Sequence, residues 1–158
     1  MPNDTSSEPQ RIVLLVGLPG SGKSTYLERL GVTALSSDTV RLLLADDATD
    51  QTIHGRVFAT LRYLVRQRLA ICRPITYVDA THLTPRERRP YVKIAQKYGC
   101  QIDALFFDVP LEVCLDRNRQ RDRSVSEEVM RKMAEKLKPP VFEEGFEKIT
   151  VVRVKTAG

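Results

Sequence analysis

The sequence predicts an α/β fold in which a parallel β-sheet is flanked by helices on both faces. Short apolar runs alternate with longer segments of helical periodicity along most of the 158 residues. The first run, residues 12–16, contains no polar residue, which is typical of a strand buried on both faces of a parallel sheet. Strands that alternate with helices also favour parallel pairing, because the helices serve as crossovers.

The first half of the chain continues with a short helix and then a long helical region. A helix is expected at 23–31 and a short strand at 33–36. Apolar residues at helical spacing then predict a helical region over 38–72, interrupted by the polar and acidic stretch 45–52. Pro74 ends this region, because proline cannot continue a helix.

The second half repeats the alternation of strands and helices. The segment Thr84-Pro85-Arg86-Glu87 is a capping box with proline at the first helical position, and Gly99 is the expected end of that helix. Ser124 or Ser126 can cap the last helix. The expected strands are 75–78, 102–107 and 149–154, and the expected helices are 84–98, 110–121 and 124–137.

Composition and charge limit the class of protein. Residues 1–10 are polar and form an expected flexible tail, so that residues 11–158 make one domain. No apolar run is long enough to cross a bilayer, and the N-terminus lacks the core of a signal peptide, so we expect a cytoplasmic protein without a membrane segment. The net charge of +5 favours a polyanionic partner such as a nucleotide or a nucleic acid.

A glycine-rich segment after the first strand carries the strongest chemical signal. It matches the P-loop pattern at every fixed position and reads Gly17-Leu18-Pro19-Gly20-Ser21-Gly22-Lys23-Ser24. The glycines let successive backbone N–H groups converge on phosphate oxygens, and the following helix adds its positive N-terminal end. Lys23 can bridge the β- and γ-phosphates, and Ser24 can bind Mg²⁺. ATP and Mg²⁺ are therefore the expected cofactors.

P-loops occur in kinases, GTPases and motor ATPases, so other features must decide among these classes. The sequence has no Asn-Lys-x-Asp motif, which argues against a GTPase. It has no apolar run that ends in Asp-Glu, which argues against a motor ATPase. The next residue, Thr25, either faces the α-phosphate or lies on the helix surface, and both readings stay open.

Two acidic residues follow expected strands and therefore fall on the same edge of the sheet as the P-loop. Asp38 can accept a hydroxyl proton and align that oxygen with the γ-phosphorus. On the motif alone, it is equally open that Asp38 is only the N-cap of a helix. Arg41 lies on the same helix face and can hold the transferred phosphoryl group or a phosphate of the acceptor. Asp79 ends a buried strand, where it can hold Mg²⁺ or orient the acceptor, and we favour this over simple turn formation.

An arginine-rich hinge between two expected helices predicts a lid over the triphosphate. Its sequence is Arg117-Asn118-Arg119-Gln120-Arg121-Asp122-Arg123. The arginines of such a lid neutralise charge in the transition state, and we expect Arg121 first and Arg117 next to do so. A solvated basic helix end is the alternative.

Other polar side chains lie near the expected site. His82 follows Thr81 at the end of a strand and is a candidate contact of the acceptor, whereas His54 has no such context and is expected at the surface. A second basic cluster comprises Arg86, Arg88, Arg89 and Lys93. It either binds an anion or forms the solvent-exposed face of a helix, and we favour the solvent-exposed face.

Together these motifs resemble the P-loop polynucleotide kinases, the 5′-hydroxyl kinase module of phage and bacterial end-healing enzymes. The resemblance extends from residue 11 to about residue 137. It rests on residues 17–25, on Asp38 with Arg41, on residues 79–89, and on Phe107-Asp108-Val109-Pro110 before the arginine hinge. It implies a P-loop NTPase fold of the small-kinase type with an arginine-rich lid, and an ATP-dependent kinase that acts on the 5′-hydroxyl end of DNA or RNA in nucleic acid repair.

The resemblance also implies roles for the matching residues. Asp38 resembles the general base, Arg41 the contact of the scissile or acceptor phosphate, and Asp79 the acidic residue near the acceptor and the metal. Catalysis is expected from Lys23, Asp38, Arg41, Asp79 and Arg121, and metal binding from Ser24 and Asp79. ATP binding is expected from Gly17, Pro19, Gly20, Ser21, Gly22, Lys23, Ser24, Thr25, Arg117 and Arg121.

Two other functions stay open from the sequence. A P-loop kinase of similar build can act on a sugar, an antibiotic or a nucleotide-sugar, in which case a closed pocket is expected near Asp38. A non-catalytic module that binds ATP is the third reading, in which replacement of Asp38 leaves function unchanged.

Overall fold

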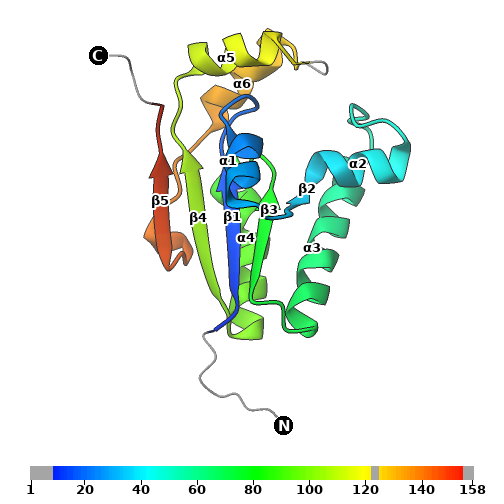
Figure 1. Ribbon diagram of the computed structural model, residues 1–158, viewed down its shortest axis with the longest axis vertical. Helices are drawn as coiled ribbons and strands as arrows, with labels where there is room; N and C mark the ends of the chain where they lie inside the picture. Colours follow the sequence, from blue (N-terminus) through cyan, green and yellow to red (C-terminus); the bar gives the residue numbers. More distant parts are fainter. Residues whose placement is uncertain (1–8, 122–124, 155–158) are drawn as a thin grey trace.

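The computed structural model describes residues 9–121 and 125–154 and shows the predicted α/β fold (Figure 1). One five-stranded sheet has the order β2-β3-β1-β4-β5, and each neighbouring pair is parallel. Its strands are β1 (Arg11–Val16), β2 (Leu35–Ser36), β3 (Ile75–Asp79), β4 (Gln101–Phe107) and β5 (Lys148–Val152). The helices are α1 (Lys23–Leu30), α2 (Ser37–Ala45), α3 (His54–Ala70), α4 (Pro85–Tyr98), α5 (Leu111–Arg119) and α6 (Glu127–Lys136), with a 3₁₀ turn η1 at Phe142–Glu144.

Helices cover both faces of the sheet, as the sequence predicts. Alternate side chains of a strand point to opposite faces. In the central strand β1, Ile12, Leu14 and Val16 pack with α3 and α4, whereas Val13 and Leu15 pack with α1, α5 and α6. Burial on both faces is the reason that β1 has an uninterrupted apolar sequence.

A third and smaller core cluster joins α2 to α3 beside the β2 edge of the sheet (Figure 1). In this cluster Val40 of α2 packs with Val57 and Leu61 of α3. The contact between the two helices thus has a small core of its own, while Val65 and Leu69 pack the second half of α3 into the larger cluster on the sheet.

The turn between α2 and α3 is held by two local motifs. The Asp47 carboxylate accepts hydrogen bonds from the amide and hydroxyl of Thr49 at 2.9 and 2.6 Å. The Asp50 carboxylate does the same for Thr52 at 2.8 and 2.6 Å. These hydrogen bonds lower the pKa of both carboxyl groups, because they favour the charged form. The helix break expected at 45–52 is an ordered turn.

Capping residues set the ends of α4 and α6 as the sequence predicts. The Thr84 hydroxyl accepts the amide of Glu87 at 3.2 Å, and Gly99 ends α4 in the left-handed region with φ of 66°. Ser126 caps α6, and its hydroxyl accepts the amide of Val129 at 3.3 Å. The other candidate cap, Ser124, lies outside the described residues.

Three details complete the comparison with the expected elements. The strand expected at 33–36 has only two residues, Leu35 and Ser36, which pair with Val78 and Asp79 of β3. Residues 1–8 of the expected tail lie outside the described part, whereas Gln10 donates hydrogen bonds to the carbonyls of Leu69 and Arg73 at 3.2 and 2.8 Å. Within the described ranges, no helix is both long and apolar enough to span a bilayer.

Candidate active site

The predicted site residues gather at the edge where the carboxyl ends of the parallel strands meet. A cleft of about 940 Å³ lies there. One side, the P-loop wall, consists of residues 19–25 with Arg117 and Arg121. The other side, the α2–α3 wall, consists of Ser36, Ser37, Asp38, Arg41, Ala48, Thr49, Gln51, His54 and Phe58. In Figure 1 the P-loop ends β1, between α5 and α6 above it and α2 and α3 beside it.

Glycines shape the P-loop because two positions exclude side chains. Gly20 and Gly22 have φ of 80° and 102°, in the left-handed region that favours glycine. A Cβ on Gly20 would lie 2.7 Å from the carbonyl oxygen of Cys114, so α5 packs directly on the loop. Because α1 begins at Lys23, its N-terminal end points into the cleft beside the loop. This geometry matches a binding site for phosphates.

Lys23 is held against the loop by its own hydrogen bonds. Its Nζ donates to the carbonyl oxygens of Gly17 and Leu18 at 2.6 and 3.1 Å. Burial of the ammonium lowers the pKa of Lys23 to about 8, although the charges of Asp79 and Asp38 oppose this shift. An anion bound at this position would favour the charged ammonium.

Asp79 ends β3 and Asp38 lies in the first turn of α2, but both share one electrostatic environment with Lys23. Burial raises the pKa of the Asp79 carboxyl, Lys23 lowers it, Asp38 raises it, and Arg121 lowers it. The structure therefore brings together four of the five residues expected to be catalytic. A carboxyl that is buried near two cations is typical of functional sites.

The residues expected to hold Mg²⁺ are compatible with that ion. Ser24 and Asp79 both line the cleft, and hydroxyl and carboxylate oxygens are the ligands that Mg²⁺ prefers. Among the described residues, no group of three or more His, Cys, Asp or Glu side chains is arranged as a metal site. A magnesium ion here would therefore need further oxygens from the triphosphate and water, as is usual for nucleotide sites.

Arg41 is the fifth residue, and it is buried in the α2–α3 wall. It is 5% exposed, and its Nη1 lies 3.7 Å from Oδ1 of Asp38. Its Nη2 lies 3.4 Å from Nδ1 of His54, and its Nε has no hydrogen-bond partner among the described residues. The N-cap of α2 is Ser36, so the interpretation of Asp38 as a mere N-cap is wrong. Asp38 stands in the first turn with an exposed carboxylate.

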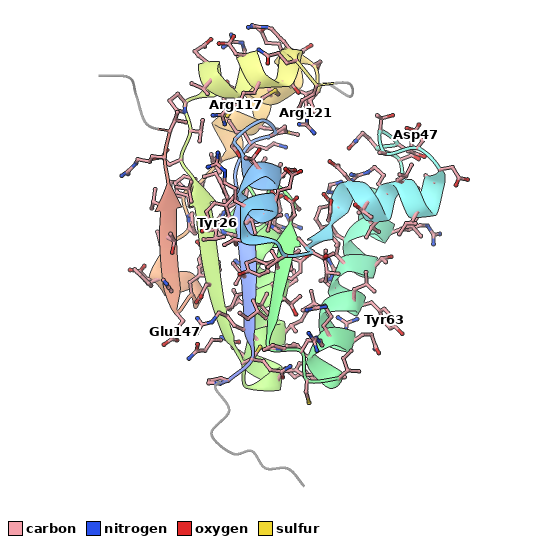
Figure 2. The ribbon with its side chains drawn as sticks, in the orientation of Figure 1. Tyr26, Asp47, Tyr63, Arg117, Arg121 and Glu147 are labelled. Atoms are coloured by element: carbon pink, nitrogen blue, oxygen red, sulfur yellow. The ribbon has the colours of Figure 1, made fainter. Side chains whose placement is uncertain are left out.

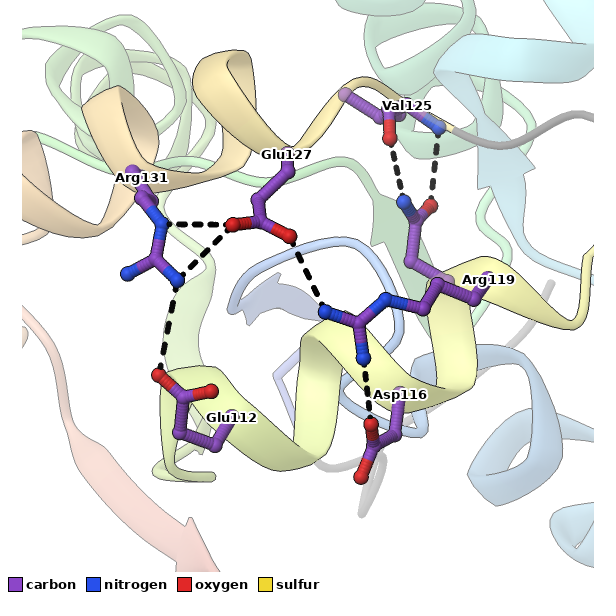
Figure 3. Close-up of polar contacts among 7 residues, drawn as sticks. Glu112, Asp116, Arg119, Val125, Glu127 and Arg131 are labelled. Carbon is purple, nitrogen blue, oxygen red and sulfur yellow. Dashed lines mark hydrogen bonds and ion pairs between the residues drawn. The ribbon is translucent and has the colours of Figure 1, made fainter.

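The arginine hinge divides between the cleft and the outer surface. Arg117 and Arg121 line the cleft, and Arg117 Nη1 donates to the carbonyl oxygen of Gly20 at 3.4 Å (Figure 2). Arg119 instead pairs with Asp116 and Glu127 at 2.7 and 3.1 Å (Figure 3). Arg123 lies outside the described residues. The preference for Arg121 and Arg117 over Arg119 thus agrees with their positions.

The sequence missed two sets of cleft residues. His54 is exposed, as expected, but it also lines the cleft together with Phe58. Their spacing of four residues on one helix was the available signal, because such residues share a face. The sequence analysis also did not identify an apolar group beside the P-loop wall. This group consists of Val125, Val129, Met133, Val152 and Val154.

Two polar residues are buried, although His82 was a candidate contact of the acceptor and Arg88 was expected on a solvent-exposed helix face. His82 is 1% exposed and is absent from the cleft lining; its Nδ1 donates to the Leu15 carbonyl oxygen at 2.6 Å. Burial lowers the pKa of His82 to about 4, so its imidazole is neutral. Arg88 is 0% exposed, because it forms two hydrogen bonds of 2.9 Å with Glu144 and one of 2.8 Å with the His82 carbonyl oxygen. The expectation of a solvent-exposed helix face is therefore wrong for Arg88, while Arg86, Arg89 and Lys93 are not buried.

Known proteins resemble this chain over most of its length. An L-seryl-tRNA(Sec) kinase of Methanococcus maripaludis is 24% identical over 136 residues, which cover 82% of this chain and 53% of that protein. This chain therefore spans about half the length of that relative.

Two solved structures share the fold. A chain of the Pnkp1/Rnl/Hen1 RNA repair complex is 23% identical with a TM-score of 0.70, covering 85% of this chain and 46% of that one. The APS kinase CysC of Mycobacterium tuberculosis, solved with AMPPNP and APS, is 26% identical with a TM-score of 0.54, covering 72% and 71%. The AAA domain family matches residues 12–140. With this match over most of its residues, and with a P-loop kinase fold, the chain belongs to the AAA domain family.

Proposed function

We propose that the chain is an ATP-dependent kinase that transfers the γ-phosphate of ATP to the 5′-hydroxyl end of a polynucleotide. The observation that carries this proposal is the pairing of Asp38 with the buried Arg41 on one wall of the cleft that Lys23 enters from the other. A candidate base and a candidate phosphate ligand thus lie side by side, in the electrostatic environment of the P-loop lysine.

In the proposed reaction, each of these side chains has one role. The Asp38 carboxylate accepts the proton of the 5′-hydroxyl group while that oxygen attacks the γ-phosphorus. The new O–P bond forms as the bond between the γ-phosphorus and the β–γ bridging oxygen breaks, and ADP leaves. Lys23 and Arg121 stabilise the negative charge of the phosphoryl group and the leaving oxygen. Ser24, with Asp79 nearby, would hold Mg²⁺, and the ion would supply further charge neutralisation.

The charge of α3 supports a polyanionic acceptor. This helix begins at the cleft and has no acidic residue, whereas it carries four arginines, Arg56, Arg62, Arg66 and Arg68. Arg68 uses its guanidinium on the Thr76 hydroxyl and the Ile75 carbonyl oxygen. The other three have no ion pair with a described carboxylate, so their charge is available to phosphates.

A small-molecule kinase is the second candidate, favoured by the similarity to the APS kinase of Mycobacterium tuberculosis. A hydroxyl group carried by an aminoacyl-tRNA is a third acceptor to test, because the relative from Methanococcus maripaludis is an L-seryl-tRNA(Sec) kinase. These alternatives share the phosphate donor and differ in the group that Asp38 deprotonates.

The decisive experiment measures transfer of labelled γ-phosphate from ATP with Mg²⁺ to a panel of acceptors. The panel contains 5′-hydroxyl DNA, 5′-hydroxyl RNA, seryl-tRNA and adenosine phosphosulfate. We expect label on the 5′ end of at least one oligonucleotide, with DNA and RNA in parallel arms. Label on adenosine phosphosulfate or seryl-tRNA alone would refute the polynucleotide acceptor.

Replacement of the proposed base separates chemistry from binding. Asp38→Asn keeps the size of the side chain but removes the proton acceptor, so we expect the transfer rate to fall about 10²–10⁴-fold. Binding of ATP should be unchanged in a titration of the same variant. The matched control is Asp46→Asn, because the exposed Asp46 does not line the cleft and its side chain makes no hydrogen bond or ion pair among the described residues. Equal transfer rates of Asp38→Asn and the wild type would remove Asp38 from the mechanism and favour a non-catalytic module.

A further inference from the structure

We propose that His54 and Phe58 form a stacking platform for the base of the acceptor's terminal nucleotide. This inference rests on the proposed function and specifies its acceptor as a nucleotide rather than a sugar. It assigns a binding role to two residues that belong to neither the P-loop nor the arginine hinge.

The two rings pack against each other within the cleft. They stand four residues apart at the start of α3, with ring centroids 4.7 Å apart and planes tilted by 46°. Both residues line the same cleft as Asp38 and Arg41. Phe58 is half-buried against the small α2–α3 core cluster, so its ring is held by packing. Aromatic surfaces of this kind stack nucleobases with little dependence on sequence, because every base has a π-face.

His54 also ties the platform to the buried arginine. A guanidinium can only donate, so in the 3.4 Å contact between Arg41 Nη2 and His54 Nδ1 the imidazole nitrogen accepts. The contact fixes the position of Arg41 relative to the rings.

The arrangement matches three groups of one nucleotide. Asp38 faces the 5′-hydroxyl group in the proposed reaction, and the rings of His54 and Phe58 face the base. Arg41 is almost fully buried, and its Nε lacks a partner among the described residues, so its guanidinium is a ready ligand for the phosphate on the 3′ side. A simple sugar presents no planar base that would use the platform.

The same helix supplies a matched control. Tyr63 is a third aromatic residue of α3, but it is 54% exposed and does not line the cleft. In Figure 2 it lies far along α3 from the P-loop and the labelled arginines. A Tyr63→Leu variant therefore loses an aromatic ring from α3 without changing the platform.

The test compares two acceptors that differ only in one base. One is a short 5′-hydroxyl oligonucleotide, and the other has an abasic residue at its 5′ end. We expect the wild type to favour the complete acceptor by about 10- to 100-fold in kcat/KM, mainly through KM, since stacking on aromatic rings has this strength. In the double variant His54→Asn, Phe58→Leu this preference should fall to about threefold or less, while Tyr63→Leu retains it. An unchanged preference in the double variant, or equal use of both acceptors by the wild type, would overturn the platform.

The substitutions are chosen to preserve the surroundings of the rings. In His54→Asn the amide oxygen of the new side chain takes the place of Nδ1 and can accept from Arg41, and in Phe58→Leu the apolar packing is kept. Unchanged binding of ATP by the double variant will show that it folds.

A binding measurement separates failure of the platform from failure of the proposed reaction. A 5′-hydroxyl oligonucleotide with 2-aminopurine as its first base is titrated with protein and a non-hydrolysable ATP analogue. Stacking on the rings should quench the fluorescence in the wild type and in Tyr63→Leu, but not in the double variant. Quenching without phosphate transfer would refute the kinase proposal and keep the platform. Transfer without quenching would keep the kinase proposal and refute the platform.

Discussion

The two walls of the cleft are built in different ways. The P-loop wall is made largely of consecutive residues, 19–25, whose backbone conformation is set by glycines. The α2–α3 wall is made of side chains from two helices and the turn between them, with Asp38 and His54 sixteen positions apart. Backbone N–H groups recognise any triphosphate, whereas scattered side chains recognise the shape and charge of one acceptor. In the proposed function, the first wall therefore binds the phosphate donor and the second selects the acceptor.

Removal of Lys23 tests the claim that the P-loop wall acts alike on every acceptor. Lys23→Ala removes the charge that the β- and γ-phosphates would contact, so we expect kcat/KM to fall on the order of 10³-fold. The loss should be the same for every acceptor that the wild type uses, as measured by transfer of labelled phosphate. Lys93→Ala is the control, because Lys93 is exposed on α4. A loss that differed between acceptors would show that the P-loop wall also contributes to the choice of acceptor.

Removal of Arg41 tests the opposite claim for the α2–α3 wall. A charge-assisted contact with the 3′-side phosphate should contribute about 10- to 100-fold to kcat/KM. We therefore expect Arg41→Ala to lose this factor with a dinucleotide acceptor and to lose much less with a nucleoside that has no 3′ phosphate. Kinetics with the two acceptors give the comparison directly. If both acceptors suffered equally, Arg41 would serve the transferred phosphoryl group instead.

The smallest effect concerns the protonation of Lys23. Its pKa of about 8 means that the free protein loses the ammonium proton as pH rises through 8, whereas bound phosphates favour the charged form. Binding of ATP at about pH 9 should therefore take up close to one proton, and binding well below pH 8 should take up almost none from Lys23. Calorimetry in two buffers of different ionisation enthalpy measures this uptake. The same titration with Lys23→Ala should show no such dependence on pH.

The fold and the P-loop wall could be predicted because their signals are local. The buried run 12–16, the capping box at 84–87 and the glycine at position 99 each determine an element from its own residues. The P-loop pattern likewise contains both its turn and its helix start. Strand β2 was predicted too long, because only Leu35 and Ser36 pair with β3 and nothing in residues 33–36 themselves marks where that pairing begins.

Side chains whose role depends on distant partners could not be predicted. Arg88 has its carboxylate partner 56 positions away in η1, so nothing near it in the sequence signals burial. His82 is buried because it reaches back to the carbonyl oxygen of Leu15. His54 and Phe58 enter the cleft because α3 packs beside β2 and α2. In each case the packing of elements, rather than local sequence, decides the environment.

The small separate core between α2 and α3 has a consequence for how such proteins diverge. Val40, Val57 and Leu61 hold α2 against the first half of α3, whereas Val65 and Leu69 anchor the second half of α3 in the larger cluster on the sheet. An insertion or deletion in the turn 46–53 would therefore reshape the entrance to the cleft while leaving strand pairing and the P-loop intact, and lengthening a surface turn costs little loop-closure entropy. Evolution can exchange one acceptor for another here by altering a single turn, and a library of variants confined to that turn is the natural starting point for engineering new specificity.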